Sequence, residues 1–294
     1  MSVEQRPTVA AALTASSGPA GTAATVDAIA AARARNRGGL REAVGDTALV
    51  AGRNLLKIVR IPQLIVFSTI QPVMFLLLFS YVFGGVAKVP GVSYKTYIVP
   101  TVLVQTLTFA ASASGVGLAT DLQSGMIDRF RALPMARSAV LVGRALSDGL
   151  RILLQAALLL VVATLIGFRF PAGVPRGLAM LAVGVVFGTT LSIFTAWIGL
   201  TLKDPETVQV ASFVPIFPLV FVSSGFSPVN QLPGWMQEFA RLNPFTSVVD
   251  TMRGLALGGR YAHHLGSSAW HTVVWIIVIL TVFVSLSVRQ YRRV

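Results

Sequence analysis

Long stretches without a charged side chain are the feature that most constrains the fold of this chain. Asp, Glu, Lys and Arg are absent from six runs, which cover residues 61–87, 96–120, 152–168, 177–202, 207–237 and 261–288. A helix that crosses a bilayer needs about 20 consecutive, mostly apolar residues. Charged residues make up only 12% of the chain, against about 25% in soluble domains. The runs therefore predict membrane-spanning helices and exclude an ordinary soluble domain.

The predicted fold is an all-α integral membrane protein with six spans. Lipid offers the backbone no hydrogen-bond partners, so each apolar run must satisfy its own amide and carbonyl groups as a helix. The run after Thr207 has 31 residues, too many for one straight crossing, and Gly225, Pro228 and Pro233 interrupt it. The absence of cysteine excludes a disulfide scaffold and a thiolate metal site. The expected spans are about 64–84, 97–119, 145–168, 178–202, 208–225 and 270–288.

The distribution of Lys and Arg predicts the side of the membrane on which each loop lies. Cytoplasmic loops carry an excess of these residues. On alternate sides of the six predicted spans, 17 of the 24 cationic residues fall on the side of both termini and seven on the other. Both termini are therefore expected in the cytoplasm, and the net charge of +13 reflects topology rather than nucleic-acid binding. Twenty Arg against four Lys is typical of a GC-rich genome, so a bacterial plasma membrane is the expected location.

Two segments precede the first span. Residues 1–40 are rich in Ala and small polar residues, lack the Leu-rich segment of a signal peptide, and are expected to form a disordered cytoplasmic tail. Residues 41–62 are predicted to form an amphipathic helix on the inner membrane surface, and residues 63–294 the transmembrane domain. A flank that only orients the first span is the alternative for 41–62. The apolar positions at helical spacing are Val44, Ala48, Ala51, Leu55 and Ile58.

The predicted cytoplasmic loop over residues 120–144 is the longest between two spans on that side. Acidic and basic side chains alternate in it around four apolar ones, and Pro134 would end a short helix there. Such a helix, with an apolar edge and a charged edge, can dock on a soluble partner. A plain charged connector is the alternative. The apolar positions are Met126, Ile127, Phe130 and Leu133.

Two short helices are predicted outside the membrane between the fifth and sixth spans, over residues 233–242 and 244–257. Asn243 is expected as the N-cap of the second helix, with Pro244 at its first position and Gly258 after its end. Asp250 and Arg253 are spaced to pair at i, i+3. Neither helix is long enough to span, so a half-buried, re-entrant hairpin is expected.

The order of these elements and two motifs resemble the type-2 ABC transporter permeases, in particular the daunorubicin/doxorubicin-resistance branch. The first motif is the stretch Ser124–Arg137, SGMIDRFRALPMAR, followed by LVGR at 141–144. It is similar to the family's Gly–acidic/basic–Leu-Pro–Arg–Gly-Arg loop. The second motif, NPFTSVVDTMRGLALG at 243–258, is similar to the family's outer Asn-Pro…Arg…Leu-Gly motif. The resemblance covers residues 50–290 approximately.

This resemblance implies the type-2 ABC exporter fold and the membrane subunit of an ATP-driven exporter. The chain has no Gly-x-x-x-x-Gly-Lys-Ser/Thr phosphate loop, so ATP and Mg²⁺ are expected on a separate ABC ATP-binding subunit, in two copies. This permease is expected to have no catalytic site, to bind no cofactor or metal of its own, to pair with a second permease as a homo- or heterodimer, and to contact membrane lipid. The residues implied in ATPase coupling are Gly125, Asp128, Arg129, Phe130, Arg131, Leu133, Pro134, Arg137 and Arg144, and the outer motif contributes Asn243, Pro244, Asp250 and Arg253.

A substrate path is expected along the interface between two permease copies. Polar and aromatic side chains stand inside the apolar runs of spans 1, 2 and 5, and three Phe residues repeat at i, i+4 and i+8. An uncharged, aromatic path suits a hydrophobic or amphipathic substrate, a lipid or an aromatic antibiotic, moved outward. Packing of the Phe stripe against neighbouring helices is the alternative. The candidate residues are Gln71, Gln105, Phe109, Phe213, Phe217 and Phe221.

The sequence disfavours two other functions. A secondary transporter or channel is disfavoured because no charged residue stands at mid-depth of a span, and Asp148 and Arg151 are expected to neutralise each other at the start of the third. A lipid-modifying membrane enzyme is disfavoured because no mid-depth His or Asp is available to activate a nucleophile. His263, His264 and His271 have no acidic neighbour that would favour a metal site.

Overall fold

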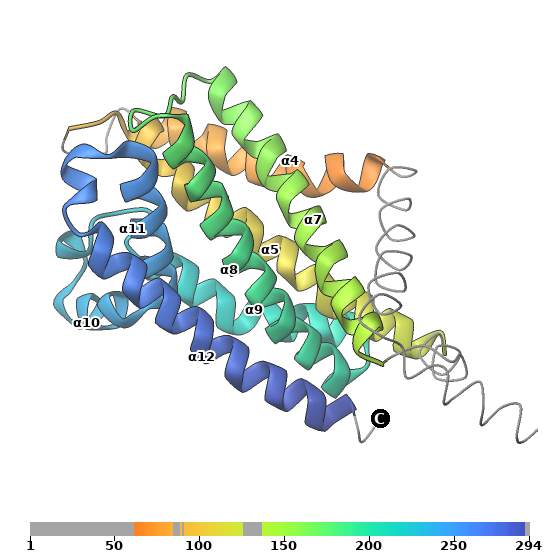
Figure 1. Ribbon diagram of the computed structural model, residues 1–294. Coiled ribbons are helices and arrows are strands. Elements are labelled where there is room, and N and C mark those ends of the chain that lie inside the picture. The colour runs from red at the N-terminus through yellow and green to blue at the C-terminus, as the bar shows by residue number, and fades with distance from the viewer. Residues whose placement is uncertain (1–61, 85–88, 90, 126–136, 292–294) are drawn as a thin grey trace, which may run out of the picture.

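A computed structural model describes residues 62–84, 89, 91–125 and 137–291, and all secondary structure in this part of the chain is helical (Figure 1). The predicted tail 1–40, nearly all of the 41–62 helix and residues 126–136 of the cytoplasmic loop lie outside the described residues. The side chains of Arg137 and Arg144 do so as well, although the backbone of both belongs to a described helix.

Each of the six predicted spans coincides with a helix. The helices are α4 (Pro62–Leu78), which continues as a π-helical turn η1 (Phe79–Phe83), α5 (Tyr94–Gln123), α7 (Arg137–Leu165), α8 (Val174–Leu202), α9 (Pro205–Phe221) and α12 (Leu265–Tyr291). Among the described residues, four of these are long and apolar enough to cross a membrane: α5, α7 from Leu146 onward, α8 and α12. The apolar stretches Thr69–Phe83 and Pro205–Phe221 are shorter.

The shorter elements follow α9. They are the 3-10 turn η2 (Val229–Gln231), α10 (Gly234–Leu242), α11 (Pro244–Leu257) and the 3-10 turn η3 (Gly259–Ala262). In Figure 1, α10 and α11 lie at the left end of the bundle, while the start of α4, the end of α5 and the end of α12 lie toward the right. The helices therefore alternate in direction between two ends, and α10 and α11 share one of them.

Helix α5 is the centre of the bundle. It packs against α4, α7, α8, α9 and α11, and 78% of its most apolar stretch is buried, against 6% for α12. Membrane helices associate by close packing rather than by hydrophobicity, because lipid tails are as apolar as the side chains. The peripheral α12 thus exposes its apolar side chains along most of its length.

Small residues bring α5 and α8 into backbone contact. A Cβ atom on Gly115 would lie 2.3 Å from the carbonyl oxygen of Thr195, and one on Gly199 would lie 2.5 Å from the carbonyl oxygen of Gly115. The Thr195 hydroxyl donates to the Ala111 carbonyl at 2.7 Å across the same contact. Only glycine permits this approach, which is the small-residue packing typical of membrane helices.

Helix α9 begins and ends earlier than the span predicted at 208–225. Asp204 caps its start by accepting from the Thr207 amide at 2.8 Å, and Pro205 occupies the first helical position. Hydrogen bonds from the Thr207 hydroxyl and amide hold the pKa of Asp204 below its ordinary value, so the cap is ionised. Pro215 and Pro218 lack the amide that a helix needs, and the helix ends at Phe221 rather than continuing to Gly225.

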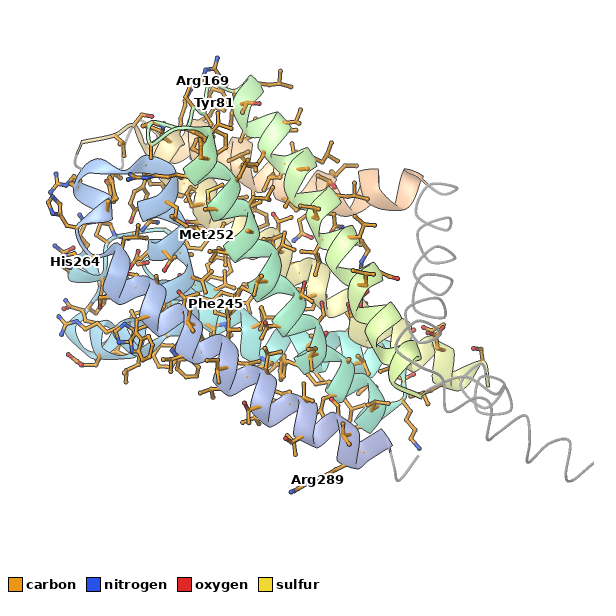
Figure 2. All side chains as sticks on the ribbon, in the orientation of Figure 1. Tyr81, Arg169, Phe245, Met252, His264 and Arg289 are labelled. Carbon is orange, nitrogen blue, oxygen red and sulfur yellow. The ribbon has the colours of Figure 1, made fainter. Side chains whose placement is uncertain are left out.

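Helices α10 and α11 differ strongly in burial, although a half-buried pair was expected. Most of α10 is exposed, whereas 12 of the 14 residues of α11 are buried. The ring of Phe245 meets that of Phe187, 5.3 Å between centroids, and Phe187 lies about 20 Å along α8 from its start. Figure 2 shows Phe245 and Met252 inside the bundle. Helix α11 therefore re-enters the bundle, and α10 stays at its surface.

Candidate functional site

Asn243, the first residue of the outer motif at 243–258, forms hydrogen bonds to the C-terminal end of α9. Asn243 caps α11, as predicted, by accepting from the Phe245 amide at 2.9 Å. Its amide nitrogen also donates to the carbonyls of Leu219 at 2.6 Å and Val222 at 2.7 Å. A helix end leaves its last carbonyls without partners, and one side chain here satisfies two of them while starting the next buried helix.

Arg253 on α11 is the centre of a polar cluster. The cluster meets α5 at Thr101, about 10 Å along that helix from its start. Its side chain is 4% exposed. It donates to the carboxylate of Asp250 at 3.0 Å, which confirms the predicted i, i+3 pair, and to the hydroxyl of Thr101 at 3.2 Å. It also donates to the carbonyls of Ser224 at 3.2 Å and Gly225 at 3.1 Å. A buried charge is tolerated where it is paired and hydrogen-bonded, and here both terminal nitrogens of the guanidinium have partners.

Three further contacts complete the cluster. The guanidinium of Arg253 lies 3.7 Å from the ring centroid of Tyr97, a cation–π geometry. The Tyr97 hydroxyl donates to the Ser224 carbonyl at 3.1 Å, and the Ser224 hydroxyl donates to Asp250 at 2.7 Å. Asp250 and Arg253 were predicted from the sequence, but Tyr97, Thr101 and Ser224 were not. The hydrogen bonds of Tyr97 and Thr101 to the segment after α9 join residues more than 120 positions apart. Those of Ser224 to α11 span fewer positions.

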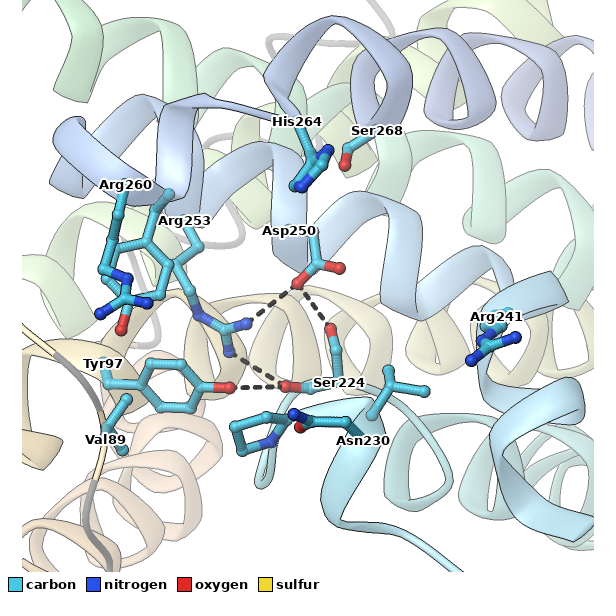
Figure 3. Close-up of a pocket in the computed structure, with 13 residues that line it drawn as sticks. Val89, Tyr97, Ser224, Asn230, Arg241, Asp250, Arg253, Arg260, His264 and Ser268 are labelled. Carbon is cyan, nitrogen blue, oxygen red and sulfur yellow. Dashed lines mark hydrogen bonds and ion pairs between the residues drawn. The ribbon is translucent and has the colours of Figure 1, made fainter. Parts of the chain in front are cut away.

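A cavity of about 760 Å³ opens beside this cluster (Figure 3). Its lining comes from the start of α5, the segment after α9, α10, α11, η3 and the first turns of α12. Figure 3 shows Arg253 bonded to Asp250 and Ser224, with Arg260 on one side and His264 and Ser268 beyond Asp250. The charged and titratable side chains in the lining are Tyr97, Arg241, Asp250, Arg253, Arg260, Tyr261 and His264.

The predicted substrate-path residues fall into two aromatic contacts. The ring centroids of Phe109 and Phe213 are 5.1 Å apart, which joins α5 to α9. Those of Phe217 and Phe221 are 4.4 Å apart on α9. The Phe221 ring then stacks on Phe226 at 5.1 Å.

Phe226 extends this aromatic strip to the first helix. Its ring centroid is 4.8 Å from that of Phe79, and Phe79 stacks with Phe75 at 5.9 Å and Phe83 at 5.2 Å. Phe75, Phe79 and Phe83 repeat at the same i, i+4 spacing as the α9 stripe, a signal that could have predicted them, whereas Phe226 has no such local signal. Half of the Phe217 side chain, 54%, is exposed, so the strip borders an open face of the bundle.

The two glutamines of the predicted path have different surroundings. Gln71 is exposed on α4. Gln105 is buried in α5, 3% exposed, and neither its amide nitrogen nor its oxygen has a hydrogen-bond partner within the described residues. Gln105 stands one turn from Thr101 and one turn from Phe109, both of which contact α9 or the segment after it. The two side chains thus do not converge on one point.

The predicted coupling residues are only partly visible. Gly125 follows the C-cap of α5 and has a left-handed backbone, with φ +65°. No described atom lies within 4 Å of the position that its Cβ would take. Asp128, Arg129, Phe130, Arg131, Leu133 and Pro134 lie outside the described residues, so their role stays a prediction.

Asp148 and Arg151 form the pair that the sequence predicted. Their charged atoms are 3.4 Å apart, and both side chains are largely buried. Arg151 also donates to the Ala110 carbonyl at 2.9 Å and the Ser114 hydroxyl at 3.1 Å. The pair therefore joins α7 to α5 rather than standing as a lone proton-carrying carboxylate.

Comparison with known proteins decides the family. The ABC-2 type transporter family matches residues 46–257. The chain belongs to the ABC-2 type transporter family. This permease is 30% identical to the daunorubicin resistance ABC transporter permease protein DrrB1 of Streptomyces coeruleorubidus over 254 residues, 85% of this chain and 87% of the relative. It is 26% identical to the probable doxorubicin resistance permease DrrC of Mycobacterium tuberculosis over 217 residues, 74% and 78% of the two chains.

Family membership defines the class of protein. This ABC-2 permease is a multi-pass membrane protein and the translocating subunit of an ABC transporter, and it resembles relatives that are named as permeases. In this family the ATPase is a separate subunit, so an ATP-binding partner is required. The predicted permease function is thereby confirmed, and the secondary-transporter, channel and lipid-modifying-enzyme alternatives are not needed.

Proposed function

We propose that this ABC-2 permease forms the membrane half of an ATP-driven exporter for hydrophobic or amphipathic compounds, aromatic drugs or lipids. The observation that carries the proposal is the aromatic strip Phe75–Phe79–Phe226–Phe221–Phe217. It borders an exposed face on which the described residues place no charged side chain at mid-depth. The relatives named for daunorubicin and doxorubicin resistance support the substrate class.

Six spans with both termini in the cytoplasm agree best with the chain. Helix α4 and η1 are continuous over 22 residues. Asn243 bonds to the carbonyls of Leu219 and Val222, so the segment that follows α9 extends the apolar crossing. The excess of Lys and Arg, 17 against seven, is on the side of Gln123, Lys203 and Tyr291. The α10–α11 end would then be external, and a reporter fused after Val294 should read as cytoplasmic. A C-terminal reporter that reads as external would contradict the six-span arrangement.

A second permease copy would cover the exposed face of α4 and α9. The exposed large side chains at helical spacing are Met74 and Leu78 on α4, Tyr81 on η1, and Val210, Val214 and Phe217 on α9. A shallow groove of about 500 Å³ follows α9 from Glu206 to Phe217. Gln71 adds one polar group to this face. Two permeases that face each other here would enclose the path for substrate, with two ATP-binding subunits that carry ATP and Mg²⁺ on the cytoplasmic side.

Drug efflux tests this function. Co-expression of the permease with its ABC ATP-binding subunit in a drug-sensitive bacterium should lower the accumulation of fluorescent daunorubicin or of a fluorescent phospholipid in the inner leaflet. Phe217→Ala should slow efflux by about three- to tenfold, since one aromatic contact contributes roughly 0.5–1.5 kcal/mol. Phe239→Ala, on exposed α10 and outside the strip, is the matched control. Unchanged accumulation of both compounds with an active ATPase would refute the proposed substrate class.

The loop at 120–144 is proposed as the contact that couples the ATPase to the permease. Arg131 offers a forked donor for carboxylates and Pro134 shapes the turn. Arg131→Ala or Pro134→Ala should leave membrane insertion intact but weaken ATPase association, by roughly 2–5 kcal/mol for a buried charged contact. Pull-down of the ATP-binding subunit and efflux by variants at wild-type expression would be measured. If both variants, singly and together, behave as wild type, the loop is a plain connector.

A further inference from the structure

The segment between α9 and α12 contains three cationic residues, Arg241, Arg253 and Arg260, and all three line the 760 Å³ cavity. They come from three different elements, α10, α11 and η3. His264 adds an imidazole, and among the described residues Asp250 is the one carboxylate in the lining. Such convergence of guanidinium groups around a cavity creates a positive potential that attracts an anion.

Neutralisation of these charges by the protein is incomplete. Arg253 pairs with Asp250, but its buried Nε atom has no hydrogen-bond partner within the described residues. Within the described residues Arg241 pairs with Glu238 alone, and both side chains of that pair are mostly exposed, where an ion pair contributes little. Arg260 makes no hydrogen bond or ion pair to any described residue; its aliphatic stem passes 3.2 Å from the Cβ position of Gly91. Two of the three guanidiniums are therefore available to a ligand.

Neutral donors surround the same space. Ser268 and Asn230 line the cavity with Tyr261. Burial raises the pKa of the Tyr261 phenol, although Arg253 and Arg260 act in the opposite direction, so it is a neutral hydroxyl at physiological pH. Guanidinium forks and hydroxyl donors form the set that suits the several acceptor oxygens of a phosphate group.

The depth of the cavity indicates where such a phosphate comes from. Tyr97 and Ser268 in its lining each stand three residues into a bundle helix, about 5 Å from its end. Trp235 on α10 is 79% exposed, and Trp270 on α12 is exposed as well. Exposed Trp side chains are typical of the headgroup level of a membrane. The cavity thus stands at the depth of phospholipid headgroups.

We propose that this cavity binds the phosphate group of an anionic ligand through Arg241 and Arg260, and that a phospholipid headgroup of the adjacent leaflet is the source. Arg253 positions the cavity wall and contributes charge. The inference goes beyond the proposed function, because it needs only a cavity at the membrane surface and holds whether or not the complex exports drugs or lipids.

The binding experiment uses the purified complex of the permease with its ATP-binding subunit in detergent. The probes are short-chain phosphatidylglycerol, phosphatidylcholine with the same chains, and inorganic phosphate, and binding is followed by tryptophan fluorescence. Phosphatidylglycerol should bind more tightly than phosphatidylcholine. Arg241→Gln and Arg260→Gln should each weaken its binding by about tenfold, and the double variant should abolish the preference. The matched control is Arg169→Gln, which removes an Arg that donates to the carbonyls of Thr164 and Phe168 and does not line the cavity.

Each outcome has a defined meaning. Loss of phosphatidylglycerol binding in the double variant, with Arg169→Gln unchanged and the complex still monodisperse, supports the site and its lipid source. Arginine-dependent binding of inorganic phosphate without a preference between the two lipids keeps the anion site but overturns the lipid source. Equal binding by wild type and the double variant overturns the site itself, while normal efflux by the same preparation would leave the proposed function standing.

Discussion

Arg253→Ala is expected to lower the free energy of unfolding by about 3 kcal/mol, because removal of one partner from a buried charge cluster leaves the others without compensation. The substitution removes the bond to Asp250 within α11 and three hydrogen bonds that join α11 to α5 and to the segment after α9. It also removes the cation from the face of Tyr97. We expect less monodisperse protein and a lower thermal transition of the permease in detergent.

Two control variants make the Arg253 prediction specific. Arg241→Ala breaks an ion pair whose side chains are both exposed, so it should change stability by at most about 0.5 kcal/mol. Arg253→Lys keeps the charge but not the forked geometry, and an intermediate loss is expected. A thermal transition of Arg253→Ala equal to that of the wild type would show that the cluster does not hold the segment after α9.

Gly115→Ala is expected to destabilise the bundle by about 2–3 kcal/mol, since the added methyl group must overlap the backbone of α8. The Cβ position lies 2.3 Å from the carbonyl oxygen of Thr195 and 2.8 Å from its carbonyl carbon. Because this obstacle is backbone rather than a rotatable side chain, α5 and α8 must move apart. The expected result is a lower thermal transition and loss of the complex with the ATP-binding subunit.

The same substitution on α12 is the matched control for this contact. No atom lies within 4 Å of the Cβ position of Gly266, and Gly266→Ala should be neutral or stabilising by about 1 kcal/mol through helix propensity. Gly199→Ala should resemble Gly115→Ala, since its Cβ position lies 2.5 Å from the Gly115 carbonyl oxygen. Equal stability of the Gly115 and Gly266 variants would contradict backbone contact between α5 and α8.

The helices were predictable because lipid makes secondary structure a local matter. Uncharged runs located all six long helices, and cap chemistry located the start of α11 at Asn243. Boundaries were less accurate where other local rules compete. Helix α9 ended at Phe221, about one turn after Pro218 and before the apolar run ended, and Asp204 with Pro205 started it earlier.

Candidate site residues were predictable where their partners are near in sequence. Asp250 with Arg253 and Asp148 with Arg151 stand one turn apart, so spacing alone predicted both pairs. The carbonyls that Asn243 satisfies, the ring under Arg253 and the convergence of Arg241 with Arg260 on one cavity have no local signature. Phe226 contacts Phe221 on α9 and Phe79 on η1 and so joins these two helices. No periodicity in the sequence predicts that α9 and η1 lie together.

The sequence by itself determined that this chain is helical and crosses a membrane, where the helices lie, and which family motifs they carry, because hydrophobic length, charge distribution and caps act within a few turns. The tertiary structure decided which helix is central, that α11 is buried while α10 is not, and which polar groups meet at Arg253. Those outcomes depend on contacts between positions such as Tyr97 and Ser224, or Gly115 and Thr195. Such contacts are chosen by the shape complementarity of whole helices, since lipid provides no hydrophobic preference between apolar faces.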